Sequence, residues 1–182
     1  NGFQAKRSSM LDKFSNRLFL IEKNNEIKNN YDDILEQVLG FRPEWAIDQN
    51  EQSQYFLKFI SGKHSHSSNG IGEGIVSIFV IVDALYDSKP GDVIIIDEPE
   101  LSLHPSLQKR LCKLFIEYSQ DRQIIISTHS PYFADIFALS NGAALVRVTS
   151  GEEGTKIYQL SDSSKNLISN LAKGNLYNPH TW

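Results

Sequence analysis

The chain has 182 residues, of which 40% are hydrophobic and 22% are charged, as is ordinary for one soluble domain with a sizeable core. The formal net charge of −4 does not favour attraction to nucleic acid over the whole surface, although it does not exclude a local basic patch. A single cysteine excludes an internal disulfide, and no apolar run is long enough to cross a membrane. We therefore expect a cytoplasmic protein without a membrane partner. Because the first residue is Asn1 rather than Met, we also expect a piece of a longer protein.

Residues 1–50 predict a helical segment. Apolar side chains recur at helical spacing over residues 3–22, residues 24–30 predict a polar connection, and residues 31–39 predict a short helix that Gly40 ends. Basic side chains of the first helix could contact DNA phosphates, although a solvated helix face is the more frequent explanation. These basic residues are Lys6, Arg7, Lys13 and Arg17.

The next elements lead to a predicted βαβ unit. Residues 55–60 predict a strand, residues 61–69 a polar loop, and residues 75–85 a buried helix that is apolar on all sides. The short β-branched run at 93–96 is typical of a strand buried on both faces. A helix from about Pro105 and a second apolar strand follow. Brief connections between them predict parallel strands. The second strand spans 123–127, and the helix stripe is Leu107, Leu111, Leu114 and Tyr118.

After this unit, Ser130 and Pro131 predict the start of another helix, with serine as its cap. Residues 144–149 and 155–160 predict a β-hairpin, and residues 167–172 predict a short helix. The predicted fold class is therefore α/β, with a parallel central sheet flanked by helices, a helical N-terminal segment and a C-terminal β-hairpin.

Acidic residues follow the first predicted parallel strand directly, at the edge where open α/β sheets bind ligands. Partly desolvated charges at such a position are costly unless they meet a cation. Asp97 is placed to hold Mg²⁺, directly or through water, and Glu98 could take a proton from an attacking water. The alternative is an acidic turn that only caps the next helix.

A histidine, His129, follows the second parallel strand, one βα unit beyond the acidic pair. Its imidazole could bind a γ-phosphate oxygen or orient the attacking water. A lone histidine after a strand is more often structural, but this position favours a catalytic role. Earlier, the glycines of residues 71–74 would let main-chain N–H groups approach a phosphate at a helix N-terminus. No Lys-Ser or Lys-Thr follows them, so they are not a P-loop.

In this order, the segments DEPE (97–100), LHP (103–105) and STHS (127–130) resemble the soluble branch of the ABC-type ATPases. That branch includes chromosome-maintenance proteins, RecF-like proteins and OLD-family nucleases. The resemblance covers roughly residues 55–150. It implies an ATPase that uses ATP and Mg²⁺, with Asp97 and Glu98 as the Walker B pair. Asp97 would assist the metal, Glu98 would be the catalytic base, and His129 would be the switch histidine.

The resemblance also implies a head that dimerises around ATP, with itself or a related head, and drives a DNA-acting machine. Residues 102–105 stand where the family has its D-loop, which crosses the dimer interface, and residues 68–74 stand where its signature binds the partner's γ-phosphate. The implied nucleotide-contacting residues are Ser68, Gly70, Gly72, Glu73, Gly74, Ser102 and His104.

The sequence contains no GxxxxGK[ST] phosphate loop. In the family, that loop lies well upstream of the signature, separated by an insertion. We therefore interpret residues 1–50 as the returning end of the insertion and residues 51–182 as the C-terminal lobe of the head. We expect ATP hydrolysis by the full-length protein and an inactive, weakly ATP-binding chain in isolation.

The Gly-Glu-Gly turn, the DEPE and LHP segments and the tail at 178–180 are most similar to the OLD group, which joins an AAA-type ATPase to a Toprim nuclease. That resemblance implies nuclease activity and a role in antiviral defence. Two alternatives stay open: a nucleotide-binding subunit of a transporter and a non-catalytic interaction platform. The lack of a transporter-type signature argues against the first, and the intact Asp97, Glu98 and His129 argue against the second.

Overall fold

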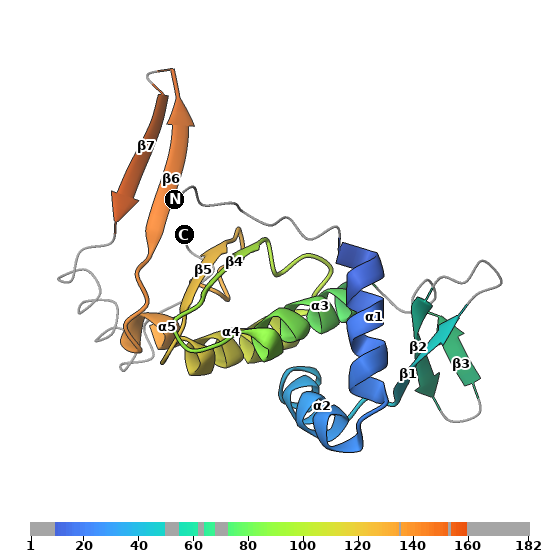
Figure 1. Ribbon diagram of the computed structural model, residues 1–182. Helices are drawn as coiled ribbons and strands as arrows, with labels where there is room; N and C mark the ends of the chain where they lie inside the picture. Colours follow the sequence, from blue (N-terminus) through green and yellow to red (C-terminus); the bar gives the residue numbers. More distant parts are fainter. Residues whose placement is uncertain are drawn as a thin grey trace, which may run out of the picture.

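The computed structural model describes residues 10–49, 55–61, 64–67, 73–134, 136–152 and 154–159. Helices and strands follow one another in a mixed α/β order (Figure 1). They are α1 (Met10–Glu22), α2 (Asn25–Leu39), β1 (Trp45–Gln49), β2 (Tyr55–Ser61), β3 (His64–Ser67), α3 (Glu73–Asp87), β4 (Val93–Asp97), α4 (Pro105–Tyr118), β5 (Gln123–Ser127), α5 (Ile136–Ser140), β6 (Val146–Gly151) and β7 (Gly154–Gln159). None of the helices in the described ranges has the length and apolar character needed to span a bilayer.

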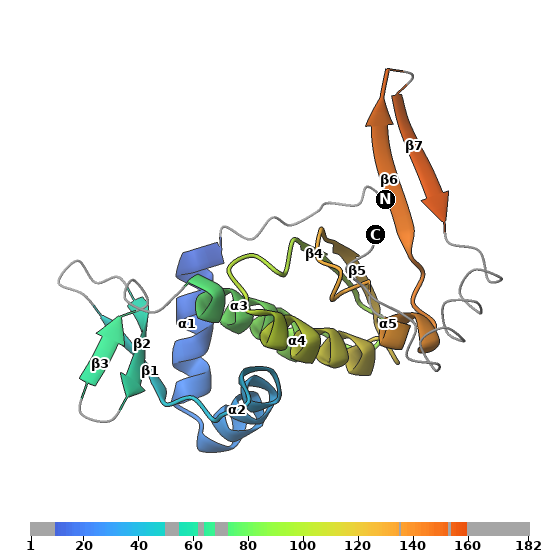
Figure 2. The same ribbon diagram turned by 180° about the vertical axis from the view of Figure 1, so that it is seen from behind.

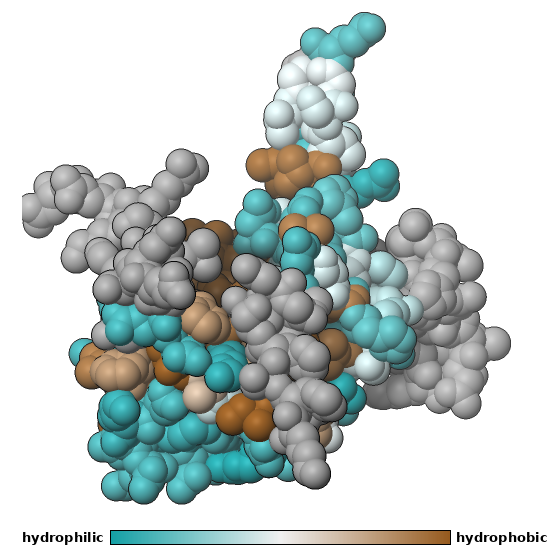
Figure 3. Space-filling model, turned by 90° about the vertical axis from the view of Figure 1, so that its right-hand side faces the viewer, coloured by the Kyte–Doolittle hydropathy of each residue, from teal (hydrophilic) through white to brown (hydrophobic). Residues whose placement is uncertain are grey.

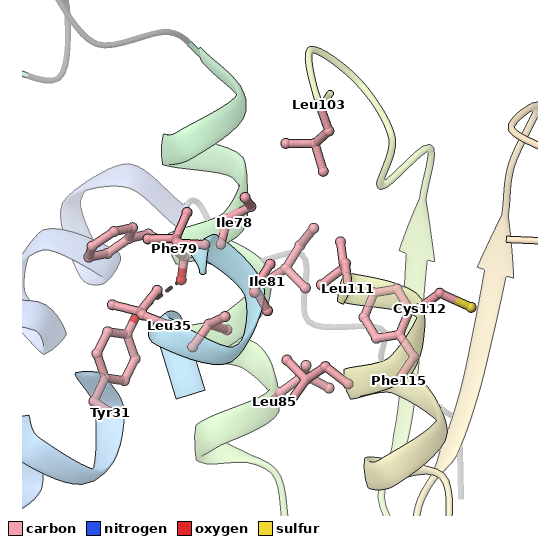
Figure 4. Packing of buried hydrophobic residues seen from close by; sticks show 14 of the residues in the cluster. Tyr31, Leu35, Ile78, Phe79, Ile81, Leu85, Leu103, Leu111, Cys112 and Phe115 are labelled. Carbon is pink, nitrogen blue, oxygen red and sulfur yellow. Dashed lines mark hydrogen bonds between the residues drawn. The ribbon is translucent and has the colours of Figure 1, made fainter. Parts of the chain in front are cut away.

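The hydrophobic core lies where α2 packs against α1, α3 and α4. Figure 4 shows side chains of α2, α3 and α4 pointing toward one another in this region. Burying one large apolar side chain contributes about 1.5–3 kcal/mol, so this contact holds the helices together. The large side chains with the least exposure are Leu18, Tyr31, Leu35, Val38, Ile78, Phe79, Val82, Leu85 and Leu111.

An ion-pair network fastens α1 to α3. Nη2 of Arg17 lies 3.1 Å from Oδ1 of Asp83, and its Nη1 lies 2.7 Å from Oδ2 of Asp87. Burial raises the pKa of the Asp83 carboxyl, while the Arg17 guanidinium opposes that rise. Arg17 therefore serves contacts within the molecule. Of the other basic residues for which a DNA contact was one alternative, Lys6, Arg7 and the side chain of Lys13 lie outside the described part.

Helix α2 begins at Asn25, so the polar connection predicted over residues 24–30 is wrong. Asn24 is the N-cap, and its Oδ1 accepts hydrogen bonds from the main-chain N–H groups of Glu26 and Ile27, both at 3.1 Å. The polar residues that suggested a connection form the solvated side of the first turns. The predicted end is confirmed, because Gly40 caps the helix in the left-handed conformation with φ 82°.

An antiparallel sheet in the order β1–β2–β3 packs beside α1. The predicted strand at 55–60 is confirmed as β2, but β1 was not predicted and β3 lies where a polar loop was expected. Main-chain pairing between β2 and β3 forms the sheet whatever the side chains, so polar residues do not prevent it. Trp45 of β1 is buried, and its indole N–H donates a 2.6 Å hydrogen bond to Oδ1 of Asp32.

Strands β4 and β5 are parallel, as the sequence predicts, and Asp97 pairs with Ser127 at the end of the ladder. One face of this pair packs on the core through Ile94, Ile96, Ile124 and Ile126. The other face is exposed, because the helices of the described ranges cover only the first: Ile95 is 74% exposed and Val93 is 51% exposed. The expectation of a strand buried on both faces is therefore wrong for the described residues.

The segment after β5 forms a turn rather than the predicted helix start. Oγ of Ser130 accepts a hydrogen bond from the Tyr132 N–H at 3.2 Å, and helix α5 begins only at Ile136. The predicted hairpin is confirmed as β6 and β7, which project from the helical body in both views (Figures 1 and 2). Figure 3 shows apolar side chains between hydrophilic ones on this hairpin. The helix predicted at 167–172 lies outside the described residues.

Candidate active site

The carboxyl ends of β4 and β5 bring the acidic pair beside the loop of the histidine. Asp97 is the last residue of β4, and the N–H of Glu98 continues the ladder with a 2.8 Å hydrogen bond to the Ser127 carbonyl. Parallel strands place their carboxyl ends at one edge, which is where open α/β sheets bind ligands. The main chain thus holds both turns together before any side chain contributes.

Glu98 and His129 face each other across this edge. Oε1 of Glu98 lies 3.6 Å from Nε2 of His129, and the side chains are 37% and 89% exposed. Glu98 has a left-handed backbone with φ 45°, a costly conformation for a residue with a side chain, and such conformations occur often at functional sites. A carboxylate and an imidazole that are close together and open to solvent can exchange protons with a bound molecule.

The carboxylate of Asp97 is open to a ligand at the end of β4. Its side chain is exposed at the strand end, and within the described ranges it makes no side-chain hydrogen bond or ion pair. Those ranges contain no cluster of three or more His, Cys, Asp or Glu residues that could hold a metal by itself. Mg²⁺ commonly binds one or two carboxylates and takes its other ligands from phosphates and water. Asp97 fits that kind of site and not an all-protein metal cage.

The loop from β4 to α4 is held by its own turns. The N–H of Leu101 donates to the Glu98 carbonyl at 3.2 Å, and the left-handed Ser102 has φ 59°. His104 is the N-cap of α4, where its Nδ1 accepts from the Ser106 N–H at 3.3 Å and Pro105 fills the first turn. The contacts of Ser102 and His104 with a nucleotide, which the resemblance implies, stay predictions.

Gly74 brings the start of α3 against this same loop. A Cβ atom at Gly74 would lie 2.3 Å from the carbonyl oxygen of Ser102 and 3.0 Å from Cδ2 of Leu103, so only glycine fits. The structure thereby brings the predicted signature end and the predicted D-loop together within one chain. Glu73 is the exposed first residue of α3. The remaining predicted residues Ser68, Gly70 and Gly72 lie outside the described part.

Two side chains for which the sequence predicts no role connect the two loops of the site. Oε1 of Glu100 accepts a 2.6 Å hydrogen bond from the main-chain N–H of His129. Gln108 of α4 accepts from the Ser130 hydroxyl at 2.5 Å and donates from Nε2 to the Leu103 carbonyl at 2.8 Å. Glu100 stands in the DEPE segment, which was the available signal. Gln108 carries no signal in the sequence.

A parallel strand pair packed on helices, with carboxylates and a histidine at the strand ends, is the arrangement that the sequence predicts for an ABC-type ATPase head. Comparison with solved structures supports this fold. A chain from work on ATP-driven dimerization and DNA-stimulated activation of SMC ATPases has a TM-score of 0.60 and 16% identity, over 90% of this chain and 99% of that one. The Smc head domain derived from Pyrococcus furiosus, bound to the C-terminal domain of ScpA, has a TM-score of 0.56 and 19% identity, over 88% and 44%.

The chain belongs to the family described as "AAA domain, putative AbiEii toxin, Type IV TA system", whose model matches residues 4–135. A curated relative is an OLD nuclease of Thermus scotoductus, which is 49% identical over 45 residues. That match spans 24% of this chain and 8% of the relative's length. The predicted membership of an ABC-type ATPase group close to the OLD family is thus confirmed.

Proposed function

We propose that this chain supplies the water-activating part of an ATP-hydrolysing site. Glu98 would accept a proton from the water that attacks the γ-phosphate, and His129 would contact a γ-phosphate oxygen. Asp97 would hold the Mg²⁺ ion, which neutralises negative charge on the phosphates. The observation that carries this proposal is the 3.6 Å separation of Glu98 and His129 at the ends of adjacent parallel strands.

The phosphate-binding part of the site would come from elsewhere. The sequence lacks a GxxxxGK[ST] loop, so we propose that an upstream segment of the full-length protein supplies it, and that residues 1–50 return from an insertion between the two. The signature around residues 68–74 would contact ATP held by a second head, a copy of this chain or a related one. The close packing of Gly74 on Ser102 supports a shared role for these two turns.

Action on DNA, nuclease activity and antiviral defence are further parts of the proposal, and they are supported by similar proteins and not by residues of the site. The similar SMC chain comes from work on DNA-stimulated activation, and the short curated match is to an OLD nuclease. DNA stimulation and nuclease activity are thus described for the SMC chain and for the OLD nuclease, respectively. For this chain we propose a head that couples ATP hydrolysis in the cytoplasm to a DNA-acting partner domain, and a nuclease is the first domain to look for.

The test is Glu98→Gln in the full-length protein, with Glu117→Gln as a matched control on the exposed side of α4. Loss of a general base lowers kcat by about 10²–10⁴-fold, while ATP binding and ATP-dependent dimerisation should persist. Steady-state ATPase and size-exclusion chromatography with ATP measure these. Unchanged turnover in Glu98→Gln would refute the catalytic assignment, and absence of ATP binding in the wild type would favour a non-catalytic platform.

A further inference from the structure

The carboxylate of Glu100 reaches from the first loop of the site to the second. It lies three residues beyond the end of β4, and its Oε1 accepts the main-chain N–H of His129 at 2.6 Å. Hydrogen bonds from N–H to a carboxylate are charge-assisted and are roughly twice as strong as neutral ones. The two residues are 29 positions apart, so this contact exists only when both loops have their native arrangement.

The side chain of Glu100 has no other described partner. Its Oε2 is buried and makes no hydrogen bond within the described residues. The turn around Glu100 uses its carbonyl, which accepts from the Leu103 N–H at 2.9 Å, and does not use its carboxylate. Burying a carboxylate oxygen without a partner costs free energy, so a local turn does not account for this side chain. Its one described side-chain hydrogen bond is with the main chain of His129.

The main chain of His129 needs such support because its side chain has little. The imidazole is 89% exposed, and its one described close contact is the 3.6 Å approach to Glu98. A catalytic group works only when held in the productive position, and a shift of about 1 Å can lower a rate by about 10²-fold. For an exposed side chain, the anchor must act on the backbone from which it projects.

We propose that Glu100 is a positioning residue, whose carboxylate anchors the backbone of His129 so that the imidazole stays opposite Glu98. The proposal rests on the proposed ATPase function and adds a residue that acts through His129 without touching the nucleotide. The loop after β4 would thereby set the position of the loop after β5. Of the hydrogen bonds that link the two loops, the one from Glu100 acts on His129 itself, so it would pass a movement of the first loop directly to that residue.

The experiment compares variants of Glu100 in the full-length protein. Glu100→Ala removes the acceptor, Glu100→Asp keeps the charge but is one methylene too short, and Glu100→Gln keeps an acceptor at the same reach. We expect Ala and Asp to lower kcat by about 10–100-fold with the KM for ATP unchanged within about twofold, and Gln to retain kcat within about fivefold. The matched control is Asp92→Ala, because Asp92 also accepts a main-chain N–H, from Lys89 at 2.8 Å, at the opposite end of β4.

Two further readouts separate positioning from general destabilisation. First, in a double-mutant cycle, Glu100→Ala should add less than about twofold to the loss already caused by His129→Ala, because it acts through that residue. Second, hydrogen exchange of the His129 amide should become about tenfold faster in Glu100→Ala and Glu100→Asp, but not in Asp92→Ala. The exchange measurement needs no ATP and therefore tests the contact by itself.

The outcomes distinguish the two proposals. If wild-type hydrolysis does not depend on Glu98, the ATPase proposal fails and the positioning role fails with it. If hydrolysis depends on Glu98, the positioning proposal alone is overturned by any of three results: kcat within twofold of wild type in Glu100→Ala and Glu100→Asp, additive losses in the cycle, or unchanged exchange of the His129 amide. Selective loss of kcat, non-additivity and faster exchange together establish it.

Discussion

The packing of Gly74 on the loop after β4 leads to a quantitative prediction for Gly74→Ala. The added methyl group would start 2.3 Å from the Ser102 carbonyl oxygen, which is backbone and cannot rotate away. Forcing an extra methyl into a filled site typically costs about 1–3 kcal/mol. Alanine regains up to about 1 kcal/mol of helix propensity, but less in the first turn where Gly74 lies. We expect a net loss of about 1–2 kcal/mol in the free energy of unfolding.

The assay is urea unfolding followed by circular dichroism, with Gly151→Ala as the control. A Cβ at Gly151 meets nothing within 4 Å, and this glycine does not have a positive φ, so its replacement should change stability by less than about 0.5 kcal/mol. In the full-length protein, Gly74→Ala should also lower ATPase, because Ser102 must move to admit the methyl group. A Gly74→Ala protein as stable as the Gly151→Ala protein would refute the close approach.

Two further predictions concern the helical core. Leu111→Ala should lower the free energy of unfolding by about 2–5 kcal/mol, because Leu111 is fully buried; a loss no larger than that of Leu20→Ala, at a residue 69% exposed, would contradict this packing. Arg17→Ala should raise the pKa of Asp83 further, since burial already raises it and Arg17 opposes the rise, and NMR titration measures the shift. The loss in free energy of unfolding caused by Arg17→Ala should be smallest at acidic pH, where Asp83 is protonated, and should grow as pH rises through the pKa of Asp83. A loss that does not change with pH would count against the ion pair.

The βαβ unit could be predicted from the sequence because its signals are local. Two short β-branched runs on either side of an amphipathic helix with a proline in its first turn are compatible with few other secondary structures. Accordingly, β4, α4 and β5 lie where they were expected. The α/β fold class and the hairpin of β6 and β7 were confirmed for the same reason. The start of α2 was not predicted, because five of the six residues after Asn24 are polar and have the composition of a loop, and only the cap geometry identifies a helix.

Features that depend on tertiary distance could not be predicted in this way. Strand β1 pairs with β2 although residues 50–54 between them lie outside the described ranges, and the polar β3 is stabilised by main-chain pairing that composition does not reveal. Whether the second face of β4 is buried or exposed depends on which other elements pack against it, and the residues of β4 alone do not determine this. In the site, the sequence placed Glu98 and His129 after two parallel strands that are one βα unit apart, and the structure brings the two side chains together. Their roles stay predictions, and the contact of Glu100 with His129 appears only once the loops are placed.

The uncovered side of β4 and β5 has a practical consequence for handling the isolated chain. The exposed side chains of Val93, Ile95 and Ile125 form a hydrophobic surface on two adjacent strands, through which molecules can associate with one another. Aggregation should therefore limit the concentration to which the purified chain stays in solution. Salts that strengthen hydrophobic association, such as sulfate, should lower that limit.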